Sequence, residues 1–283
     1  LEFRRVLFRS SMNIQNKLTM LSEMRNDSKF QILEFDRLEG ATDVGTALGL
    51  QIMNDSGIKL RQVRIILEDS SVKLESGALS YMKGEIEIKT KTGGVVGLGK
   101  KFLNSKLTGE TMFKPTYEGT GEIFLEPSFG HFALIELEDE EIIVDDGLFY
   151  ACEEDVEVGA AMQKSVSSML FGNEGIYQTS ISGSGIVVLE IPVPESEIFK
   201  CKLFNDTLKV DGNFAVLRTS NIKFTVEKSS SLIGSVTNGE GLLNVYSGTG
   251  EVWLLPTMSI YQDLRLEGLN SLANPEGSRN TEV

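Results

Sequence analysis

The pattern of apolar and polar residues predicts β-strands over most of this chain. Short segments alternate between the two types or run apolar, they are rich in Val, Ile and Phe, and Gly, Asn, Asp and Ser bound them. The segments are "EIEIKT", "HFALIELEDE", "DVEVG", "IVVLEI", "FKCKLF", "NFAVL", "IKFTVE" and "EVWLL". Helical periodicity is scarce, and the helices we expect are Ile14–Met24, Val44–Met53, Ala160–Leu170 and Lys101–Leu107.

Similar segments recur along the chain at a nearly constant spacing, which predicts an internal repeat. "GTGEIFLEP" begins at Gly119, "GSGIVVLEI" at Gly183 and "GTGEVWLLP" at Gly248, so the first glycines are 64 and 65 residues apart. A second set of three glycines is spaced by 70 and 65 residues (Gly77, Gly147 and Gly212), and an acidic residue precedes each GxG segment (Glu110, Glu174 and Glu240). A single repeat has too little core to be stable alone, so the repeats should form one body.

We therefore expect an all-β fold with one β domain over residues 62–267. It consists of three tandem repeats, at about 62–143, 144–208 and 209–267, with pseudo-threefold symmetry and few short helices. Residues 12–61 are expected to form an N-terminal extension with one strand, at "FQILEF", and short helices, and the polar tail 268–283 to be disordered. Residues 1–11 resemble a translated sequencing adapter and are set aside, which leaves Met12 or a lost residue as the natural start.

The repeated glycines have a structural explanation. Glycine lets the backbone adopt positive φ or approach another strand closely, and we expect each GxG to open an apolar strand. Phosphate binding would instead require the amide groups at a helix N-terminus. The glycines interpreted as structural are Gly77, Gly119, Gly121, Gly147, Gly183, Gly185, Gly212, Gly248 and Gly250.

The stretch "GVVGLGKK" at residues 94–101 comes within one residue of a nucleotide-binding P-loop. Gly94, Gly99 and Lys100 match GxxxxGK, but Lys101 stands where the loop needs Ser or Thr for magnesium. A P-loop also joins a strand to a long helix, whereas this stretch joins strands within a repeat. The connection that contains it, from Ile88 to Glu110, spans 22 positions, against 16 between the corresponding residues of each of the other two repeats. We interpret it as a lengthened repeat connection and predict no cofactor.

The order of these segments resembles a known family. "ESGALSYMKGEIEI", a glycine-rich stretch, "LTGETMF", "GTGEIFLEP", "IIVDDGLFYA" and "LKVDGNFAVL" together are similar to the altered inheritance of mitochondria protein 24 family, formerly domain of unknown function 124, over about residues 62–256. The resemblance implies a threefold-repeated β fold like that of the tryptophan RNA-binding attenuator protein, itself related to double-stranded β-helices. It implies no enzymatic activity and no catalytic residues, and it links mitochondrial members to inner-membrane organisation.

The net charge of the chain limits the kinds of molecule that it is expected to bind. The net charge is −14, which opposes binding to a phosphate backbone, so no nucleic-acid partner is expected. The chain has no apolar run of the roughly 18 to 20 residues that a membrane-spanning helix needs, and its start does not resemble a signal peptide, so we expect a cytoplasmic protein.

One basic segment departs from this acidic character. Five lysines and no acid lie between Ile88 and Glu110, interleaved with apolar residues. Such a patch suits peripheral contact with an anionic membrane or a protein partner, and the alternative is a loop whose apolar residues cover the rim of the barrel. The candidate contact patch consists of Lys89, Lys91, Lys100, Lys101, Phe102 and Lys106.

Residues that carry catalysis or hold metals are sparse. The single histidine, His131, cannot supply a two-histidine metal site, and no GxSxG motif accompanies it, so we expect a structural or solvent-facing side chain. Cys152 and Cys201 lack metal-ligand spacing and are expected to be reduced thiols. The acidic residues Glu136, Glu138, Asp139, Glu140, Glu141, Asp145 and Asp146 lack the spacing of a calcium loop and are expected at a solvated hairpin tip.

These observations favour a non-catalytic β scaffold or protein-interaction protein, with an unknown protein partner or self-association. The alternative is a small-ligand or RNA-binding module similar to the attenuator protein.

Overall fold

Strands dominate the fold, as the pattern of apolar residues predicts. The computed structural model describes residues 18–89, 114–163, 176–228 and 242–267. In this part of the chain thirteen strands join one antiparallel sheet, and the all-β class is confirmed. The two α-helices of these residues are α1 (Val44–Asp55) and α5 (Met258–Glu267).

The strands after α1 fall into three units that share one plan. Each unit has an opening strand, one or two return strands, and a central strand. The central strand pairs with the opening strand and with the return strands. The first unit comprises β3 (Arg61–Leu74), β4 (Leu79–Lys89) and β5 (Thr116–Leu125), and the second β6 (His131–Asp145), β7 (Phe149–Glu153), β8 (Glu157–Gln163) and β9 (Ile176–Ile191). The third comprises β10 (Phe199–Asp211), β11 (Ala215–Thr219), β12 (Lys223–Lys228) and β13 (Leu242–Leu254), and η1 (Glu195–Glu197) precedes it.

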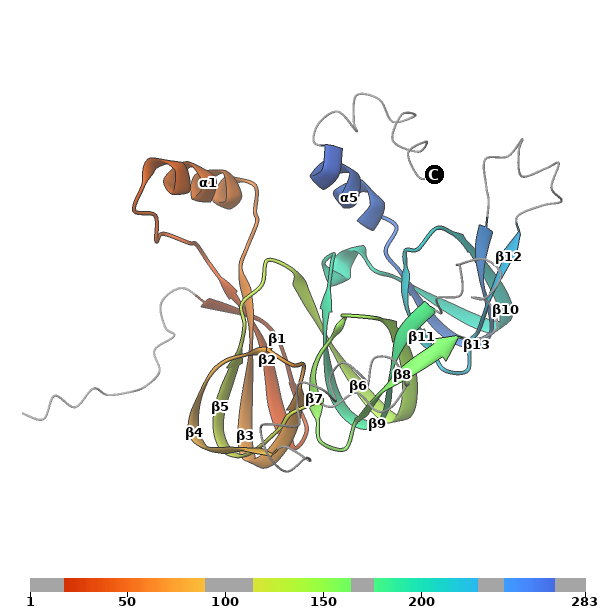
Figure 1. Cartoon of the computed structure of the whole chain (residues 1–283), viewed down its shortest axis with the longest axis horizontal. Coiled ribbons are helices and arrows are strands. Elements are labelled where there is room, and N and C mark those ends of the chain that lie inside the picture. The colour runs from red at the N-terminus through yellow and green to blue at the C-terminus, as the bar shows by residue number, and fades with distance from the viewer. Residues whose placement is uncertain (1–17, 90–113, 164–175, 229–241, 268–283) are drawn as a thin grey trace, which may run out of the picture.

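The three units lie side by side along the long axis of the molecule, with β4 at one end and β10 at the other (Figure 1). Whether a threefold axis relates them, and how closely they follow the attenuator fold, stays a prediction. The expected boundaries after residues 143 and 208 fall inside β6 and β10, so each unit begins earlier than expected. The reason is that Gly147 and Gly212 form the turn inside a unit rather than the joint between two units.

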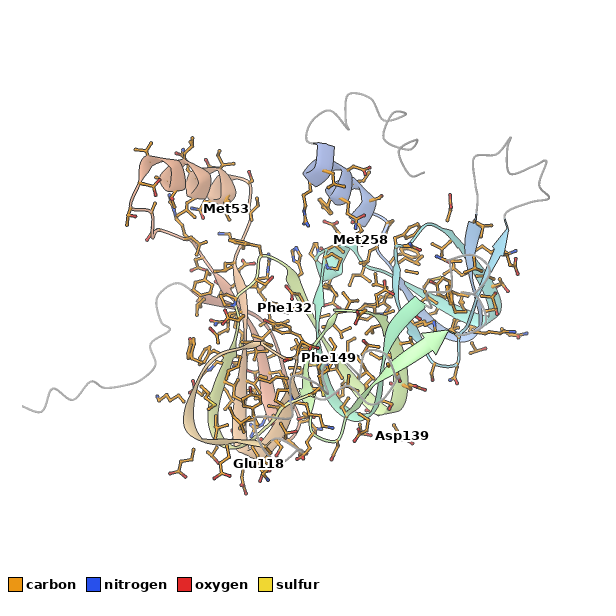
Figure 2. All side chains as sticks on the ribbon, in the orientation of Figure 1. Met53, Glu118, Phe132, Asp139, Phe149 and Met258 are labelled. Carbon is orange, nitrogen blue, oxygen red and sulfur yellow. The ribbon has the colours of Figure 1, made fainter. Side chains whose placement is uncertain are left out.

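Buried side chains form a core within and between the units. Phe30, Ile65 and Val188 belong to a cluster shared by the extension and the first two units, and Val144, Leu217 and Trp253 to one shared by the second and third. A third cluster lies within the third unit. In Figure 2, Phe132 and Phe149 lie among the packed side chains of the body, whereas Glu118 and Asp139 lie at its outer edge. The units are thus joined by shared hydrophobic packing as well as by strand pairing.

The N-terminal extension contains more β-structure than expected. β1 (Leu18–Arg25) and β2 (Ser28–Phe35) form an antiparallel hairpin, and β2 continues onto β3. The helix expected over Ile14–Met24 is therefore wrong for residues 18–24, because pairing with β2 supplies their backbone hydrogen bonds. The two residues between the strands, Asn26 and Asp27, are of the type that fills a tight hairpin turn, a signal that the helical spacing obscured.

Of the other three expected helices, one is confirmed, one is wrong in its described part, and one lies outside the described residues. The helix over Val44–Met53 is confirmed as α1, whose first turn is capped by Asp43: its carboxylate accepts from the Thr46 amide at 2.9 Å. The helix over Ala160–Leu170 is wrong at residues 160–163, which lie in β8. The rest of that segment, the helix over Lys101–Leu107 and the 268–283 tail lie outside the described residues.

Each GxG lies inside a central strand rather than at its start, which corrects the expectation. Opposite each GxG the opening strand carries an extra residue in the left-handed region, at Asp69 (φ 58°), Asp139 (φ 57°) and Asn205 (φ 53°). The hydroxyl of the residue between the glycines accepts that residue's amide, from Thr120 at 3.1 Å, Ser184 at 2.9 Å and Thr249 at 2.9 Å. A Cβ added at Gly119, Gly121, Gly185 or Gly250 would meet a return strand, and one added at Gly183 or Gly248 would meet the turn between two return strands. The structural role of these glycines stays a prediction.

Candidate functional site

The candidate contact patch is only partly within the described residues. Lys89 is exposed at the end of β4, where its ammonium group pairs with the Glu118 carboxylate, and this pairing raises the pKa of Lys89. The other members, Lys91, Lys100, Lys101, Phe102 and Lys106, lie outside the described residues, as does the P-loop-like stretch. Membrane contact through this patch therefore stays a prediction.

The acidic segment of the second unit is not a hairpin tip, which corrects the expectation. Glu136 to Glu141 lie in the middle of β6, on both sides of the bulge at Asp139, and the acidic side chains of this stretch are exposed. Asp145 and Asp146 do border a turn, but burial raises the pKa of Asp145 to about 6, partly offset by a hydrogen bond from Gln178. No group of three or more His, Cys, Asp and Glu side chains in the described part of the chain has an arrangement that could hold a metal ion.

The histidine and the two cysteines lie in different environments. His131 is the first residue of β6 and is half-buried, and burial with the nearby Arg61 charge lowers its pKa. Cys152 is buried in the core, which raises the pKa of its thiol to about 12, so the thiol is not a nucleophile at neutral pH. Cys201 is partly exposed, and both cysteines are free thiols as expected.

The joints between neighbouring units follow one rule. At the first joint the end of β3 pairs with β7, with Val72 opposite Glu153 and Leu74 opposite Ala151. At the second joint the end of β6 pairs with β11, with Ile142 opposite Thr219 and Val144 opposite Leu217. These residues are at the same distances from the GxG segments of their own units as the residues of the first joint are. The end of an opening strand is thus the place where the next unit's first return strand adds to the sheet.

In the described part of the chain, the strand segments that correspond to the two sides of this joint also occur without a partner strand, one on β10 and one on β4. On β10 the corresponding residues are Leu208, Lys209 and Val210, and on β4 they are Tyr81, Met82 and Lys83. Among the described strands β10 pairs only with β13 and β4 only with β5, so each has one unpaired edge. The two edges lie at opposite ends of the row of units (Figure 1).

Exposure differs accordingly between the open edge and its buried counterparts. Tyr81 and Met82 are 48% and 39% exposed, whereas Ala151 and Cys152, at the same positions of the second unit, are fully buried. In the third unit Leu217 and Arg218 at these positions are each 5% exposed. The end of the first unit therefore presents apolar surface at the place where the other units bury it.

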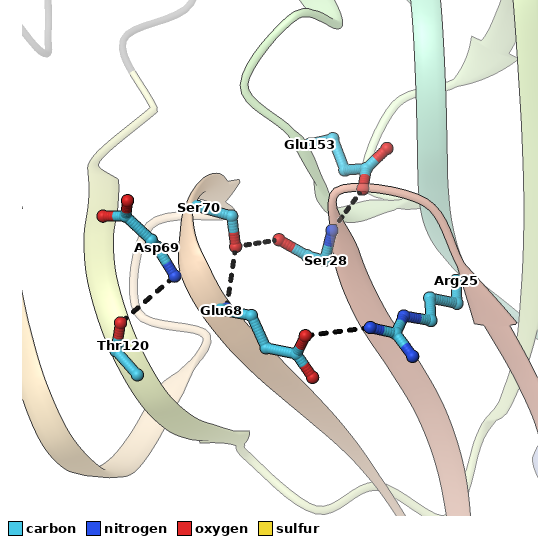
Figure 3. Close-up of polar contacts among 7 residues, drawn as sticks. All are labelled: Arg25, Ser28, Glu68, Asp69, Ser70, Thr120 and Glu153. Carbon is cyan, nitrogen blue, oxygen red and sulfur yellow. Dashed lines mark hydrogen bonds and ion pairs between the residues drawn. The ribbon is translucent and has the colours of Figure 1, made fainter.

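A cluster of polar contacts locks the β1–β2 turn into the first joint (Figure 3). The Glu153 carboxylate accepts from the Ser28 amide at 2.8 Å, the Ile186 amide at 2.9 Å and the Asn26 side chain at 3.0 Å. The hydroxyls of Ser28 and Ser70 are 2.8 Å apart, and Arg25 pairs with Glu68 at 2.8 Å. Glu153 is 3% exposed, so its charge is accommodated by this set of donors.

The second joint contains a pocket of about 430 Å³, mostly apolar. It lies between the opening strands β6 and β10 and the strands β11 and β13 of the third unit. The side chains that the later argument uses are Ile135, Leu137, Glu140, Phe204, Thr219 and Trp253.

The sequence motifs located the repeated glycines, but they did not indicate the unpaired strand edges or the pocket of the second joint. The open edges consist of ordinary strand residues, and no residue type marks them as unpaired. The signal that could have found them is the repeat itself: a row of three similar units has a first and a last unit, and each of these has one outer strand that no other unit of the row pairs with.

Comparison with known proteins finds a matching family model, a relative in sequence and a solved structure of similar fold. A family model described as "Mitochondrial biogenesis AIM24" matches residues 54–257. An uncharacterised protein of Streptococcus pyogenes serotype M6, M6_Spy0233, is 25% identical over 208 residues, which cover 71% of this chain and 83% of the relative. The crystal structure of protein SPYM3_0169 from Streptococcus pyogenes is similar with a TM-score of 0.53 and 21% identity, covering 74% of this chain and 94% of that one. In the described residues no helix is long and apolar enough to cross a membrane.

Proposed function

We propose that this chain, which belongs to the mitochondrial biogenesis AIM24 family, is a non-catalytic β scaffold. It associates with protein chains, including further copies of itself, through the strand edges that have no partner among the described strands. The observation that carries this proposal is the complementarity of its two ends. The end of β10 corresponds to the ends of β3 and β6, which form one side of the internal joints. The start of β4 corresponds to β7 and β11, which form the other side.

The internal joints supply the register of the contact between copies. Val72 faces Glu153 and Leu74 faces Ala151, so Leu208 of one copy would face Lys83 of the next and Val210 would face Tyr81. Lys209 and Met82 would form the pair between them. Such a contact is head-to-tail, so it joins different surfaces of the two copies and produces rings or open chains.

Backbone direction identifies the group to remove in a test. At the first joint the Ser71 carbonyl accepts from Glu154 and the Glu75 amide donates to Tyr150, so Lys73, between them, also directs its amide toward the joint. Lys209 holds the position of Lys73, and its amide therefore points to the open edge rather than to β13. Proline at this position removes the donor without removing a bond to β13.

The experiment is light scattering of the full chain over a range of concentrations. We expect wild-type protein to associate, and Lys209→Pro to weaken the association at least about tenfold, because it removes a hydrogen bond worth about 1 kcal/mol and adds a steric block. Lys209→Ala is the matched control, since it removes the same side chain and keeps the amide, and it should still associate. A wild-type chain that remains a monomer at high concentration would contradict the proposal.

Peripheral contact of the lysine patch with an anionic membrane is a finer part of this proposal. It draws on five lysines in a chain of net charge −14, and vesicle binding tests it separately.

A further inference from the structure

The pocket at the second joint has a counterpart at the first joint that is filled by strand β2. Ile135, Leu137 and Ile142 line the pocket, and at the same places of the first unit stand Ile65, Leu67 and Val72. On the opposite wall Trp253 takes the place of Val188. The two joints therefore form the same groove, once with an occupant and once without one among the described residues.

The occupant of the first groove shows how a strand fits. β2 pairs antiparallel with the first half of β3, with Ser28 opposite Leu67, Phe30 opposite Ile65 and Ile32 opposite Val63. Its alternate side chains point into the groove, where Phe30 and Ile32 are 0% and 4% exposed. Backbone pairing holds the strand in place, and apolar side chains at every second position fill the space.

The second groove offers the same two features. In the described residues the first half of β6, from His131 to Leu137, pairs with β9 on one edge and with no strand on the other. Ile65 is fully buried beneath β2, whereas Ile135 remains partly exposed. Phe204, at the rim of the groove, is 78% exposed. Among the described strands the free edge of β6 thus runs beside an apolar pocket at Ile135 and Leu137, whereas Ala133, nearer the start of β6, is already buried at 1% exposure.

We propose that this groove binds an extended segment of another protein, which adds antiparallel to the free edge of β6 and places a large apolar side chain against Ile135 and Trp253. The segment has the pattern of the start of β2, "SKFQ", with its second inward-facing residue, at the place of Phe30, large and apolar. This goes beyond head-to-tail association, because it uses a different edge and a different partner.

The polar residues at the end of the groove select the first position of the segment. In the first groove Ser28 lies against Ser70 and the Glu153 carboxylate. In the second groove Glu140 replaces Ser70 and Thr219 replaces Glu153. A hydrogen-bond donor at the first inward position, from Ser, Lys or Arg, meets the Glu140 carboxylate there.

The protein contains its own reporter for this binding. Trp253 is the only tryptophan of the chain, it lines the groove, and its indole amine donates to the Glu251 carboxylate at 2.7 Å. A synthetic peptide with the sequence of residues 26–36, "NDSKFQILEFD", is the probe, and a scrambled peptide of the same composition is the control. Titrating the full-length Lys209→Pro variant separates peptide binding from self-association.

We expect the probe to change Trp253 fluorescence in a saturable way and the scrambled peptide to leave it unchanged. Phe204→Ala should weaken binding at least fivefold, while Phe199→Ala, the same change at a 63% exposed position of the same strand outside the groove, should leave it unaltered. Hydrogen exchange should slow at residues 131–137 when the probe is bound. A probe that gives no saturable signal, or that binds equally well to the Phe204→Ala variant, would overturn the proposal.

Discussion

Replacing Gly119 by alanine tests whether the repeated GxG glycines are structural. An added Cβ at Gly119 would lie 2.0 Å from the carbonyl oxygen of Glu85 on the neighbouring return strand, and the backbone there has φ of 139°. At Gly147 the φ is 87°, but nothing lies within 4 Å of the added atom. Both alanines carry the strain of positive φ, about 1–2 kcal/mol, and only Gly119→Ala adds an overlap with fixed backbone.

The overlap sets the expected difference between the two variants. Overpacking of this kind costs about 1–3 kcal/mol, so we expect Gly119→Ala to lower the unfolding free energy by about 2–5 kcal/mol and Gly147→Ala by about 1–2 kcal/mol. In a domain of this size 1 kcal/mol corresponds to roughly 2–4 °C in Tm. Thermal and urea unfolding followed by circular dichroism measures both variants. Equal losses, or a Gly119→Ala variant as stable as wild type, would refute the structural role assigned to the close approach.

Three further predictions concern separate parts of the molecule. Glu153→Gln should lower stability in urea by about 1–3 kcal/mol, because one amide oxygen cannot accept from three donors, and an unchanged midpoint would contradict the role of Glu153 in the first joint. Burial raises the pKa of Asp145 to about 6 in the folded state, above its ordinary value of 3.8, so the folded state holds more protons between these values and the unfolding free energy should fall as pH rises from 4 to 7. Asp145→Asn should remove part of that slope and gain about 1–3 kcal/mol at pH 7, and a slope identical to wild type would disprove the assignment. Lys100→Glu with Lys101→Glu should abolish co-sedimentation with anionic vesicles if the lysine patch contacts membranes, and unchanged co-sedimentation would count against that contact.

Strand content and the glycine motifs could be predicted from sequence because both are local. Alternation of apolar residues located β6, β10 and β13, and the spacing of the glycines located the same GxG motif three times. The position of each GxG within its strand could not be predicted. Its cause lies on the opposing strand, where Asp69, Asp139 or Asn205 bulges, and that pairing is not visible in either segment alone.

The N-terminal hairpin and the candidate surfaces depend on tertiary pairing. Leu18, Leu21 and Met24 have helical spacing, yet β1 is a strand because β2 and β3 provide its sheet. The open edges and the groove beside β6 are defined by which of the described strands lack a described partner at a given place. Composition does not carry that information, since Tyr81 and Leu208 resemble the residues that bury the same joints elsewhere.

The most direct test of the head-to-tail contact is its register, measured by disulfide formation between copies. In a Cys201→Ser background, copies carrying Leu208→Cys are mixed with copies carrying Lys83→Cys under mild oxidation. By the internal joints these positions form a pair whose Cα atoms lie about 4.5 Å apart, within the range of a disulfide. We predict a cross-linked dimer from this mixture and little from Leu208→Cys mixed with Glu87→Cys, four residues out of register on the same strand. No dimer, or equal yields from both mixtures, would contradict the proposed contact.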